Sequence, residues 1–173
     1  RQAEQWLHAR ARQQSAIATL GQEAIAGGDL EALLATAASL AALGVGGSHA
    51  ALLELQPGGK AFRLRAGVGW NDGLVGRTTV SARSEMQAGF TLVSGRPVTV
   101  DDAAKDRRFG APPLLRDHDL VSGASVVIPG AQASWGVLAV HATEPHAWSD
   151  DDTNFLQALA SVLASAIARY GTF

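Results

Sequence analysis

Residues 121–169 constrain the fold more than any other stretch, because a strand, a tight turn, a second strand and a helix are expected there in direct succession. The first strand is expected over residues 121–128, which are rich in Val, Ile and Ser and precede the turn signal Pro129-Gly130. The second is expected over residues 135–141, where side chains alternate between two faces. Strands joined by so short a connection form an antiparallel hairpin.

The helix that follows this hairpin is marked at its start. Ser149 can cap it, and Asp152 stands three residues later, at the spacing of a capping box. Leu156, Leu159 and Leu163 then recur at steps of three and four residues, which gives the helix one apolar face. Because most helical stability in proteins comes from packing of such a face, we expect it to cover the hairpin.

Alternation along the two strands separates their side chains into two sets. The more apolar set is expected to face the terminal helices: Ala124, Val126, Ile128, Leu138 and Val140. The other set is expected to face away from them, toward a cavity: Ser125, Val127, Ala139 and His141. The sequence therefore predicts a sheet with helices on one face and some polar groups on the other.

The remaining residues add strands and helices to this unit. In chain order we expect helices over residues 1–26 and 30–43, strands over 49–56 and 61–68, a short helix between Ser84 and Gly95, and a strand over 98–100. Ser84 is expected to cap the short helix, with Gln87 at the boxed position. Residues 71–83 and 101–119 are expected to be loops.

This order predicts an α+β fold with a central antiparallel sheet of five or six strands. The N- and C-terminal helices would pack on one face of the sheet. The middle connections, with their short helices, would roof the other face and leave a cavity there.

Composition narrows the class of protein. Of the 173 residues, 47% are hydrophobic and 17% are charged, which is typical of a globular chain. Cysteine is absent, so disulfides, thiolate nucleophiles and thiolate zinc sites are excluded. A formal net charge of -2 offers no bulk attraction to nucleic acid or to an anionic membrane, and the apolar runs are too short for a membrane span. We therefore expect neither nucleic acid nor membrane as a partner.

Residues 1–28 are expected to form a signalling or linker helix ahead of a domain over residues 29–170. Apolar residues recur along this helix with heptad spacing, interrupted by Arg10 and Gln13. One interpretation is a homodimer in which the terminal helices pair through Trp6, Ile17, Leu20 and Leu163. The alternative is a solvated linker helix with an apolar C-terminal end.

Motifs spread along residues 29–169 give the chain a resemblance to a known family. In order they are G-V-G-W at 67–70, Q-A-G-F-T-L-V-S-G-R-P-V at 87–98, D-D at 101–102, R-F-G-A-P-P-L-L at 108–115, S-G-A-S-V-V-I-P at 122–129, W-G-V-L-A-V-H at 135–141 and W-S-D-D-D-T-N-F-L-Q-A-L-A at 148–160. In this order and spacing they resemble a GAF domain, the small-molecule sensing module of sensor kinases, cyclases and phytochromes. Residues 12–22 look like the linker that commonly leads into such domains.

The resemblance implies a GAF/PAS-like fold and a cytoplasmic regulatory module of a signal transduction protein, not an enzyme. Its terminal helices would pair across a homodimer and connect to an output domain in the same chain, such as a histidine kinase or a cyclase. The W-G-V-L-A-V-H strand is similar to the phytochrome strand whose histidine faces the chromophore, which would make His141 a pocket residue.

The resemblance also limits the cofactors. GAF domains that hold a bilin covalently need a cysteine, and so do methionine sulfoxide reductases of this fold, whereas this chain has none. The signature of cyclic-nucleotide-binding GAF domains is not recognisable. The ligand is therefore unknown at this point, and no metal is expected, because His141 and His146 lack the helical spacing of zinc ligands.

Nine residues are candidates for the wall of a ligand pocket: Trp70, Phe90, Arg107, Phe109, Leu115, Ser125, Val127, Ala139 and His141. His141 would exchange a hydrogen bond with a ligand, or else be satisfied by a neighbouring side chain or by water. Trp70 and Phe90 would be cavity walls, or else core residues. Arg107 or its neighbour Arg108 would bind an anionic ligand, or else form a surface salt bridge with Asp101, Asp102 or Asp106. His118, between two aspartates, is expected to be solvated.

Two hypotheses for the function follow. The first is a sensory domain that binds a small molecule and transmits a change through its terminal helices. The second is a dimerisation module of the same fold with no ligand, whose cavity is filled by its own side chains. A cavity smaller than about 300 Å³ would favour the second.

Overall fold

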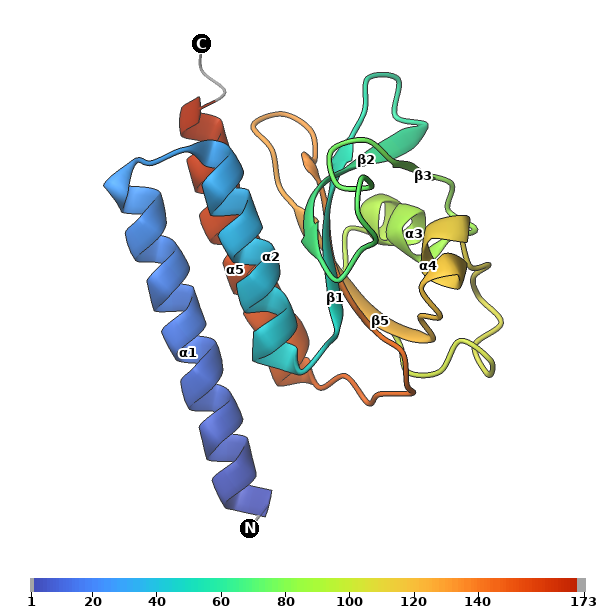
Figure 1. Cartoon of the computed structure of the whole chain (residues 1–173), viewed down its shortest axis with the longest axis horizontal. Coiled ribbons are helices and arrows are strands. Elements are labelled where there is room, and N and C mark those ends of the chain that lie inside the picture. Colours follow the sequence, from blue (N-terminus) through green and yellow to red (C-terminus); the bar gives the residue numbers. More distant parts are fainter. Residues whose placement is uncertain (1, 171–173) are drawn as a thin grey trace.

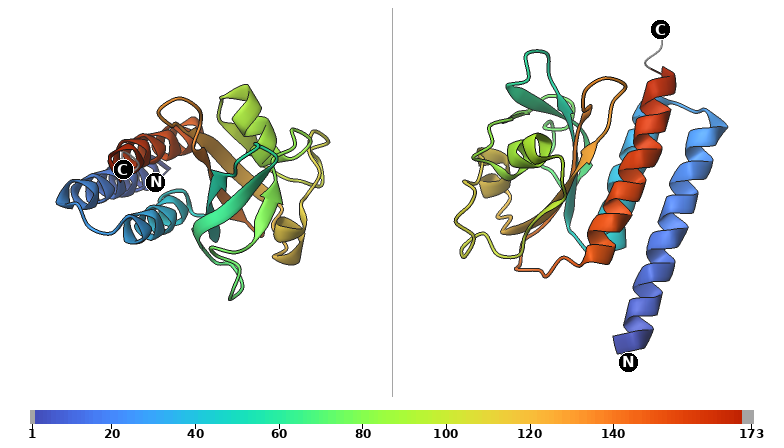
Figure 2. Two further views of the ribbon diagram at one scale, coloured as in Figure 1. Left: turned by 90° about the horizontal axis from the view of Figure 1, so that it is seen from above. Right: turned by 180° about the vertical axis from the view of Figure 1, so that it is seen from behind.

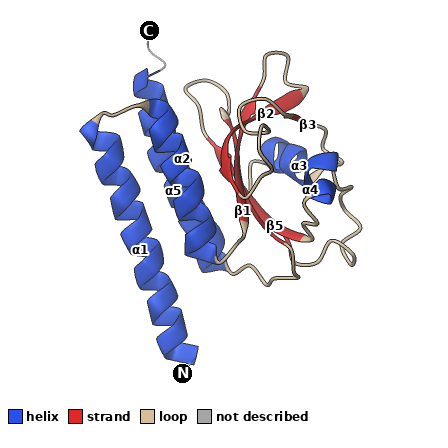
Figure 3. Ribbon diagram, viewed as in Figure 1, coloured by secondary structure: helices blue, strands red, loops and turns tan. Residues whose placement is uncertain are grey.

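Within residues 2–170, the part of the chain that the computed structural model describes, one antiparallel sheet of six strands lies between a layer of long helices and a roof of short helices and loops (Figures 1 and 3). The long helices are α1 (Gln2–Ala26), α2 (Leu30–Val45) and α5 (Asp150–Tyr170). The roof contains α3 (Gln87–Ser94) and α4 (Pro113–Asp117). This is the α+β layering that the sequence predicts.

The strands come from both halves of the chain and are paired antiparallel throughout. They are β1 (His49–Leu55), β2 (Ala61–Val68), β3 (Thr79–Ser81), β4 (Val98–Val100), β5 (Ser122–Ile128) and β6 (Gly136–Ala142), in the spatial order β3-β2-β1-β6-β5-β4. The edge strand β3 lies in residues 71–83, where a loop was expected. Its three residues are too few to show alternation, and their pairing with Ala61–Arg63 of β2 makes them a strand.

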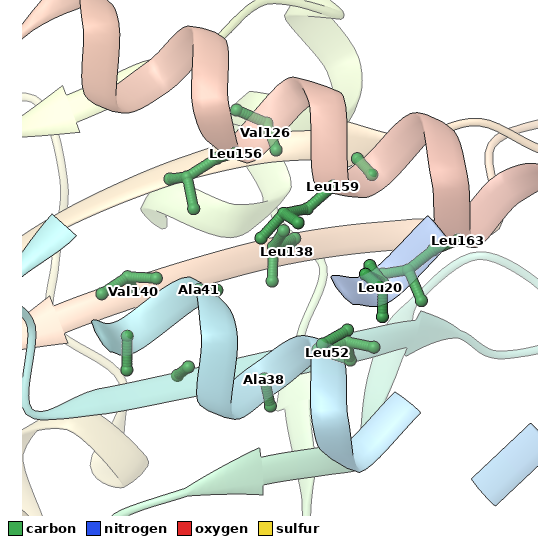
Figure 4. Close-up of a cluster of buried hydrophobic side chains, with 14 of the residues drawn as sticks. Leu20, Ala38, Ala41, Leu52, Val126, Leu138, Val140, Leu156, Leu159 and Leu163 are labelled. Atoms are coloured by element: carbon green, nitrogen blue, oxygen red, sulfur yellow. The ribbon is translucent and has the colours of Figure 1, made fainter. Parts of the chain in front are cut away.

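The main hydrophobic core fills the space between the sheet and the helix layer. Figure 4 shows Val126 of β5 and Leu138 of β6 beside Leu156 and Leu159 of α5, and Val140 of β6 beside Ala41 of α2. The set that alternation assigns to the helix side lies in this core: Ala124, Val126, Ile128, Leu138 and Val140. Burial of each Leu, Ile or Val side chain contributes about 1.5–3 kcal/mol, so these residues fix which face of the sheet the helices cover.

The capping box at the start of α5 is formed as the sequence predicts. Asp152 N donates to Ser149 Oγ at 3.1 Å, and Ser149 N donates to Asp152 Oδ2 at 3.0 Å. The expected cap of α3 is wrong. Its N-cap is Met86, which makes no side-chain capping bond in the described residues, and Ser84 lies in the preceding turn. Gln87 does not take part in a capping box; it is buried in the interior.

Helix α1 packs along α2 and α5 of its own chain (Figure 2). Its buried stripe consists of Gln13, Ala16, Leu20 and Ala24, with Ile17 partly buried beside it. Leu20 and Leu163 are both 0% exposed in this intramolecular core, so they do not form a surface between two chains. Trp6 is half-exposed and donates from Nε1 to Asp151 Oδ2 at 2.9 Å. The apolar spacing of α1 thus predicts a packed face, but the partner of that face is within the chain.

Candidate functional site

A second apolar cluster covers the face of the sheet that looks away from the long helices. It joins side chains of β1, β2, β3 and β6 with Leu114 of α4, and Trp70, Ala88 and Leu92 pack against it. Two small cavities lie on this face, of about 30 and 50 Å³. Gln87, Leu115 and His141 line both, so these three side chains stand where the cavities adjoin.

His141 is the central polar group of this site. It lies on β6, is 7% exposed, and its Nδ1 is 3.3 Å from Ser122 O. Burial lowers the pKa of His141 to about 4; the Ser122 hydrogen bond opposes this shift and the charge of His49 adds to it. The ring is therefore neutral near pH 7. With Nδ1–H donating to Ser122 O, Nε2 is an unprotonated acceptor, and it has no partner among the described residues.

Gln87 connects α3 to the sheet beside His141. Its Nε2 lies 3.2 Å from both Val98 O and Gly123 O, and 3.1 Å from Ser125 Oγ. These two carbonyls fix the orientation of the amide, because only its nitrogen can donate to them. Gln87 Oε1 then accepts no hydrogen bond within residues 2–170. Gln87 is 8% exposed, so the residue lies mostly in the interior.

Thr91, one turn after Gln87, completes this polar group. Its Oγ1 donates to Gln87 O at 2.8 Å and lies 2.8 Å from Ser125 Oγ. Gln87 was not among the predicted pocket residues. The sequence does contain one signal for it: Gln87 and Thr91 are polar and four residues apart, which places them on the same face of a largely apolar helix.

A cluster of aromatic rings closes the roof over the first cavity. The Trp70 ring centroid is 5.0 Å from that of His49 and 5.0 Å from that of His118, and Trp70 Nε1 donates to Ala50 O at 2.8 Å. His118 Nε2 accepts from Asn71 N at 3.0 Å, and its Nδ1 is 2.8 Å from Leu114 O. The expectation of a solvated His118 is wrong, because its two nitrogens join the loop after β2 to α4.

The structure brings six of the nine candidate residues together around the cavities: Trp70, Phe109, Leu115, Ser125, Ala139 and His141. Phe90 is 38% exposed on the outer side of α3, where its ring lies 5.3 Å from that of Phe109. Val127 is half-buried near the hairpin end of β5 and lines neither cavity. These two side chains are therefore not part of the cavity lining.

Arg107 also lies outside both cavities. It is exposed in an open surface hollow beside Asp101 and Asp102. Of the two arginines, Arg108 forms the expected surface salt bridge: its Nη2 lies 2.7 Å from Asp106 Oδ2, and its guanidinium stacks over Phe109. The Arg108 side chain holds the pKa of Asp106 below its usual range.

The lining of the two cavities carries very little charge. Among the described residues that line them, none is Lys or Arg, and the acidic one is Asp106, which Arg108 binds. Apart from Gln87, Ser125 and His141, the lining of the first cavity is apolar. No group of three or more His, Cys, Asp or Glu with the arrangement of a metal site occurs in residues 2–170. In the same residues, none of the helices combines the length and apolar character that crossing a membrane requires.

A sheet with long helices on one face and small, partly polar cavities on the other defines a regulatory α+β domain of the kind found in signalling proteins. The chain belongs to the GAF domain family, whose model matches residues 29–167. No curated protein matches the sequence.

Solved structures of the same fold include GAF domains from two phosphoenolpyruvate-protein phosphotransferases. The one from Coxiella burnetii is 21% identical, with a TM-score of 0.81 over 92% of this chain and 95% of that one. The one from Acinetobacter is 22% identical, with a TM-score of 0.77 over 91% and 93%. A free methionine-R-sulfoxide reductase from Neisseria meningitidis, in complex with its substrate, is 17% identical, with a TM-score of 0.76 over 94% and 93%. These likenesses show the fold.

Proposed function

We propose that this GAF domain is a non-catalytic sensory module that binds a small molecule between the sheet and the roof and passes the change to an output domain through its terminal helices. The observation that carries the proposal is the Nε2 atom of His141, an acceptor on a side chain that lines both cavities, without a partner among the described residues. A ligand that donates to Nε2 would gain a hydrogen bond there, typically worth about 0.5–1.5 kcal/mol.

Strand β6 offers a direct route from the cavity to the helices. His141 faces the cavities, whereas Leu138 and Val140 on the opposite face lie in the core formed with α2 and α5. Because close-packed cores have few voids, a displacement of β6 on the cavity side is expected to change the packing of α5. The ligand must bind the two packings with different affinity for this to act as a signal.

A second route runs through residues 143–149, which join β6 to α5. Ser122, which lines the second cavity, donates from Oγ to Glu144 O at 2.8 Å. Trp148 Nε1 donates to Val100 O at 3.2 Å, and Val100 lines the same cavity. The segment that leads into α5 is therefore hydrogen-bonded to the cavity wall.

The ligand-free module remains the second candidate, because a specific observation favours it. Cavities of about 30 and 50 Å³ are far below the size of roughly 300 Å³ from which ligand pockets usually begin. Under this hypothesis the cavities hold only water, which needs about 10–15 Å³. The sensory hypothesis requires the roof, chiefly α4 and the long loop before it, to move outward on binding.

Self-association and the output domain belong to the same proposal. A homodimer would use the outer faces of α1 and α2, where Leu7, Ile25 and Leu43 are exposed. Sedimentation equilibrium tests this: Leu43→Glu should shift a dimer toward monomer, while Gln157→Glu, on the exposed side of α5, should not. An unchanged dimer in Leu43→Glu would contradict this surface.

The output domain, such as a histidine kinase or a cyclase, would be in the same cytoplasmic chain.

A label experiment separates the two candidates. The chain contains no cysteine, so Ser15→Cys on α1 and Ser161→Cys on α5 place two spin labels at exposed positions without further changes. The labelled protein would be screened with nucleotides, tetrapyrroles, amino acids, small anions and small uncharged heterocycles. A compound that raises Tm and changes the distance between the labels supports the sensory module. If no compound does both, the ligand-free module is the better account, and chemical conversion of a bound compound would contradict a non-catalytic role.

A further inference from the structure

We infer that the cavity selects a compact, uncharged molecule that donates a hydrogen bond, and that it rejects anions. The inference rests on the proposed function, because it presumes that the cavity binds a ligand. It follows from the polar side chains that line the two cavities: His141 Nε2 and Gln87 Oε1 are acceptors without a partner among the described residues, whereas the side-chain donors already have partners.

The first free acceptor is His141 Nε2. Its ring is held in place from the side of β5, where Nδ1 lies 3.3 Å from Ser122 O. An added Cβ at Gly123 would come closer to this Nδ1 than real Cβ contacts allow, so no space remains for the ring to turn toward β5. The neutral imidazole therefore presents a lone pair on Nε2, which can bind only a donor.

The second free acceptor is Gln87 Oε1. The amide cannot turn over to offer its nitrogen to a ligand, because Val98 O and Gly123 O both accept from Nε2. Gln87 and His141 line both cavities, so a molecule that spans them meets an acceptor on each of these side chains.

The side-chain donors at the same site have partners already. Trp70 Nε1 donates to Ala50 O, and Gln87 Nε2 donates to the two backbone carbonyls. The Ser125 hydroxyl lies within hydrogen-bond distance of both Gln87 Nε2 and Thr91 Oγ1. An acceptor group on a ligand would have to displace one of these bonds, at a cost similar to that of leaving a buried polar group unpaired.

Electrostatics exclude an anion for a separate reason. No Lys or Arg among the described residues lines either cavity, and burying a charge without a partner is very costly. The remaining lining, such as Leu53, Val80 and Leu114, is apolar and suits an uncharged body. Because the cavities are small, a compact molecule requires the least outward movement of the roof.

Three related probes test this inference on the whole chain. Pyrazole is compact, neutral and carries one N–H donor; 1-methylpyrazole lacks the donor; pyrazole-4-carboxylate keeps the donor and adds a negative charge. Calorimetric titration at pH 7.5 should show that pyrazole binds at least about 10-fold more tightly than either of the others, since one buried hydrogen bond is worth about 1.4 kcal/mol or a factor of 10. This ranking needs no variant, so it does not depend on whether a variant folds.

Variants then place the binding. His141→Phe should reduce pyrazole affinity by about 10-fold, whereas His8→Phe, at an exposed position on α1, should leave it unchanged.

Equal binding of pyrazole and 1-methylpyrazole, or no binding of any probe up to 10 mM (roughly 2.7 kcal/mol of binding free energy), would overturn the inference. Tighter binding of pyrazole-4-carboxylate in the same cavity would overturn it too, yet would leave the proposed sensory function standing. The sensory function itself fails only if the full compound screen moves neither Tm nor the labels.

Discussion

The ring of His141 lies directly against the Cα of Gly123, its paired residue on the neighbouring strand β5. A Cβ at position 123 would lie well under 3.0 Å from His141 Nδ1, a separation that real Cβ atoms essentially never show. Glycine at this position is therefore required by the histidine across the strand pair. The two residues together fix the direction in which Nε2 faces.

Replacement of Gly123 by Ala should push the imidazole off Ser122 O and into the cavities. We expect a loss of about 1–3 kcal/mol in the free energy of unfolding, the usual cost of adding a methyl group to a packed interior. Urea denaturation measures it. Gly21→Ala is the control: it lies in α1 with open space around its Cβ, so it should be neutral or stabilising by up to about 1 kcal/mol. Equal stability of Gly123→Ala and wild type would contradict this packing.

The stability of the protein should fall as the pH is lowered from about 6.5 toward 4. In the folded state burial lowers the pKa of His141 from 6.5 to about 4, so between these values the unfolded chain binds the proton and the folded chain does not. The free energy of unfolding should therefore rise with pH across this window and level off above it, by up to about 3 kcal/mol. His49, whose pKa is lowered by burial and by His118, acts in the same direction.

Urea denaturation at several pH values checks this dependence. His141→Gln cannot titrate and should lose most of the slope between pH 4 and 6.5. His8→Gln, exposed on α1, should keep the slope. A wild-type slope that survives in His141→Gln would show that other groups are responsible.

Replacement of Gln87 by Leu should destabilise the roof. The substitution removes the hydrogen bonds that Gln87 Nε2 makes with Val98 O, Gly123 O and Ser125 Oγ in the interior, and a hydrogen bond of this kind typically contributes about 0.5–1.5 kcal/mol. Hydrogen exchange should show faster exchange in α3 than in α5, because α3 loses its bonds to the strands. Gln157→Leu, exposed on α5, is the matched control and should exchange like wild type.

Asp152 should contribute more to stability than Ser149, although both belong to the same capping box. Ser149→Ala should cost about 1 kcal/mol, the usual value of an N-cap. Asp152→Ala should cost more, because Asp152 Oδ1 also accepts from Gln13 Nε2 at 3.0 Å, which ties α1 to α5. A double-mutant cycle with Gln13→Ala measures the coupling free energy between Gln13 and Asp152. A coupling energy of zero would show that the contact between the helices does not stabilise the domain.

The parts of the fold that the sequence predicts well are those that depend on local periodicity. Alternation along W-G-V-L-A-V-H separates Leu138 and Val140 from Ala139 and His141, and the structure confirms the separation. The capping box at Ser149 is likewise a property of four consecutive residues. By contrast, β3 and α4 have three and five residues, too few for a period, and they form because the rest of the fold pairs or packs with them.

The site was harder to predict, because its contacts join distant residues. The spacing of Ser84 and Gln87 suggests a cap, yet the amide of Gln87 binds carbonyls 11 and 36 residues away. Heptad spacing in α1 likewise predicts an apolar face but not its partner, and Leu20 packs within the chain. His118 looked solvated beside two aspartates, although its ring nitrogens bind Asn71 and Leu114.

The most direct test of the account is the protonation of His141, measured by 15N NMR of the imidazole nitrogens at pH 7.5. We predict a neutral ring with the proton on Nδ1, and an Nε2 signal that shifts when pyrazole is added. A ring protonated on Nε2, or a charged imidazolium at this pH, would contradict the account, because His141 could not then act as the acceptor that faces the cavity.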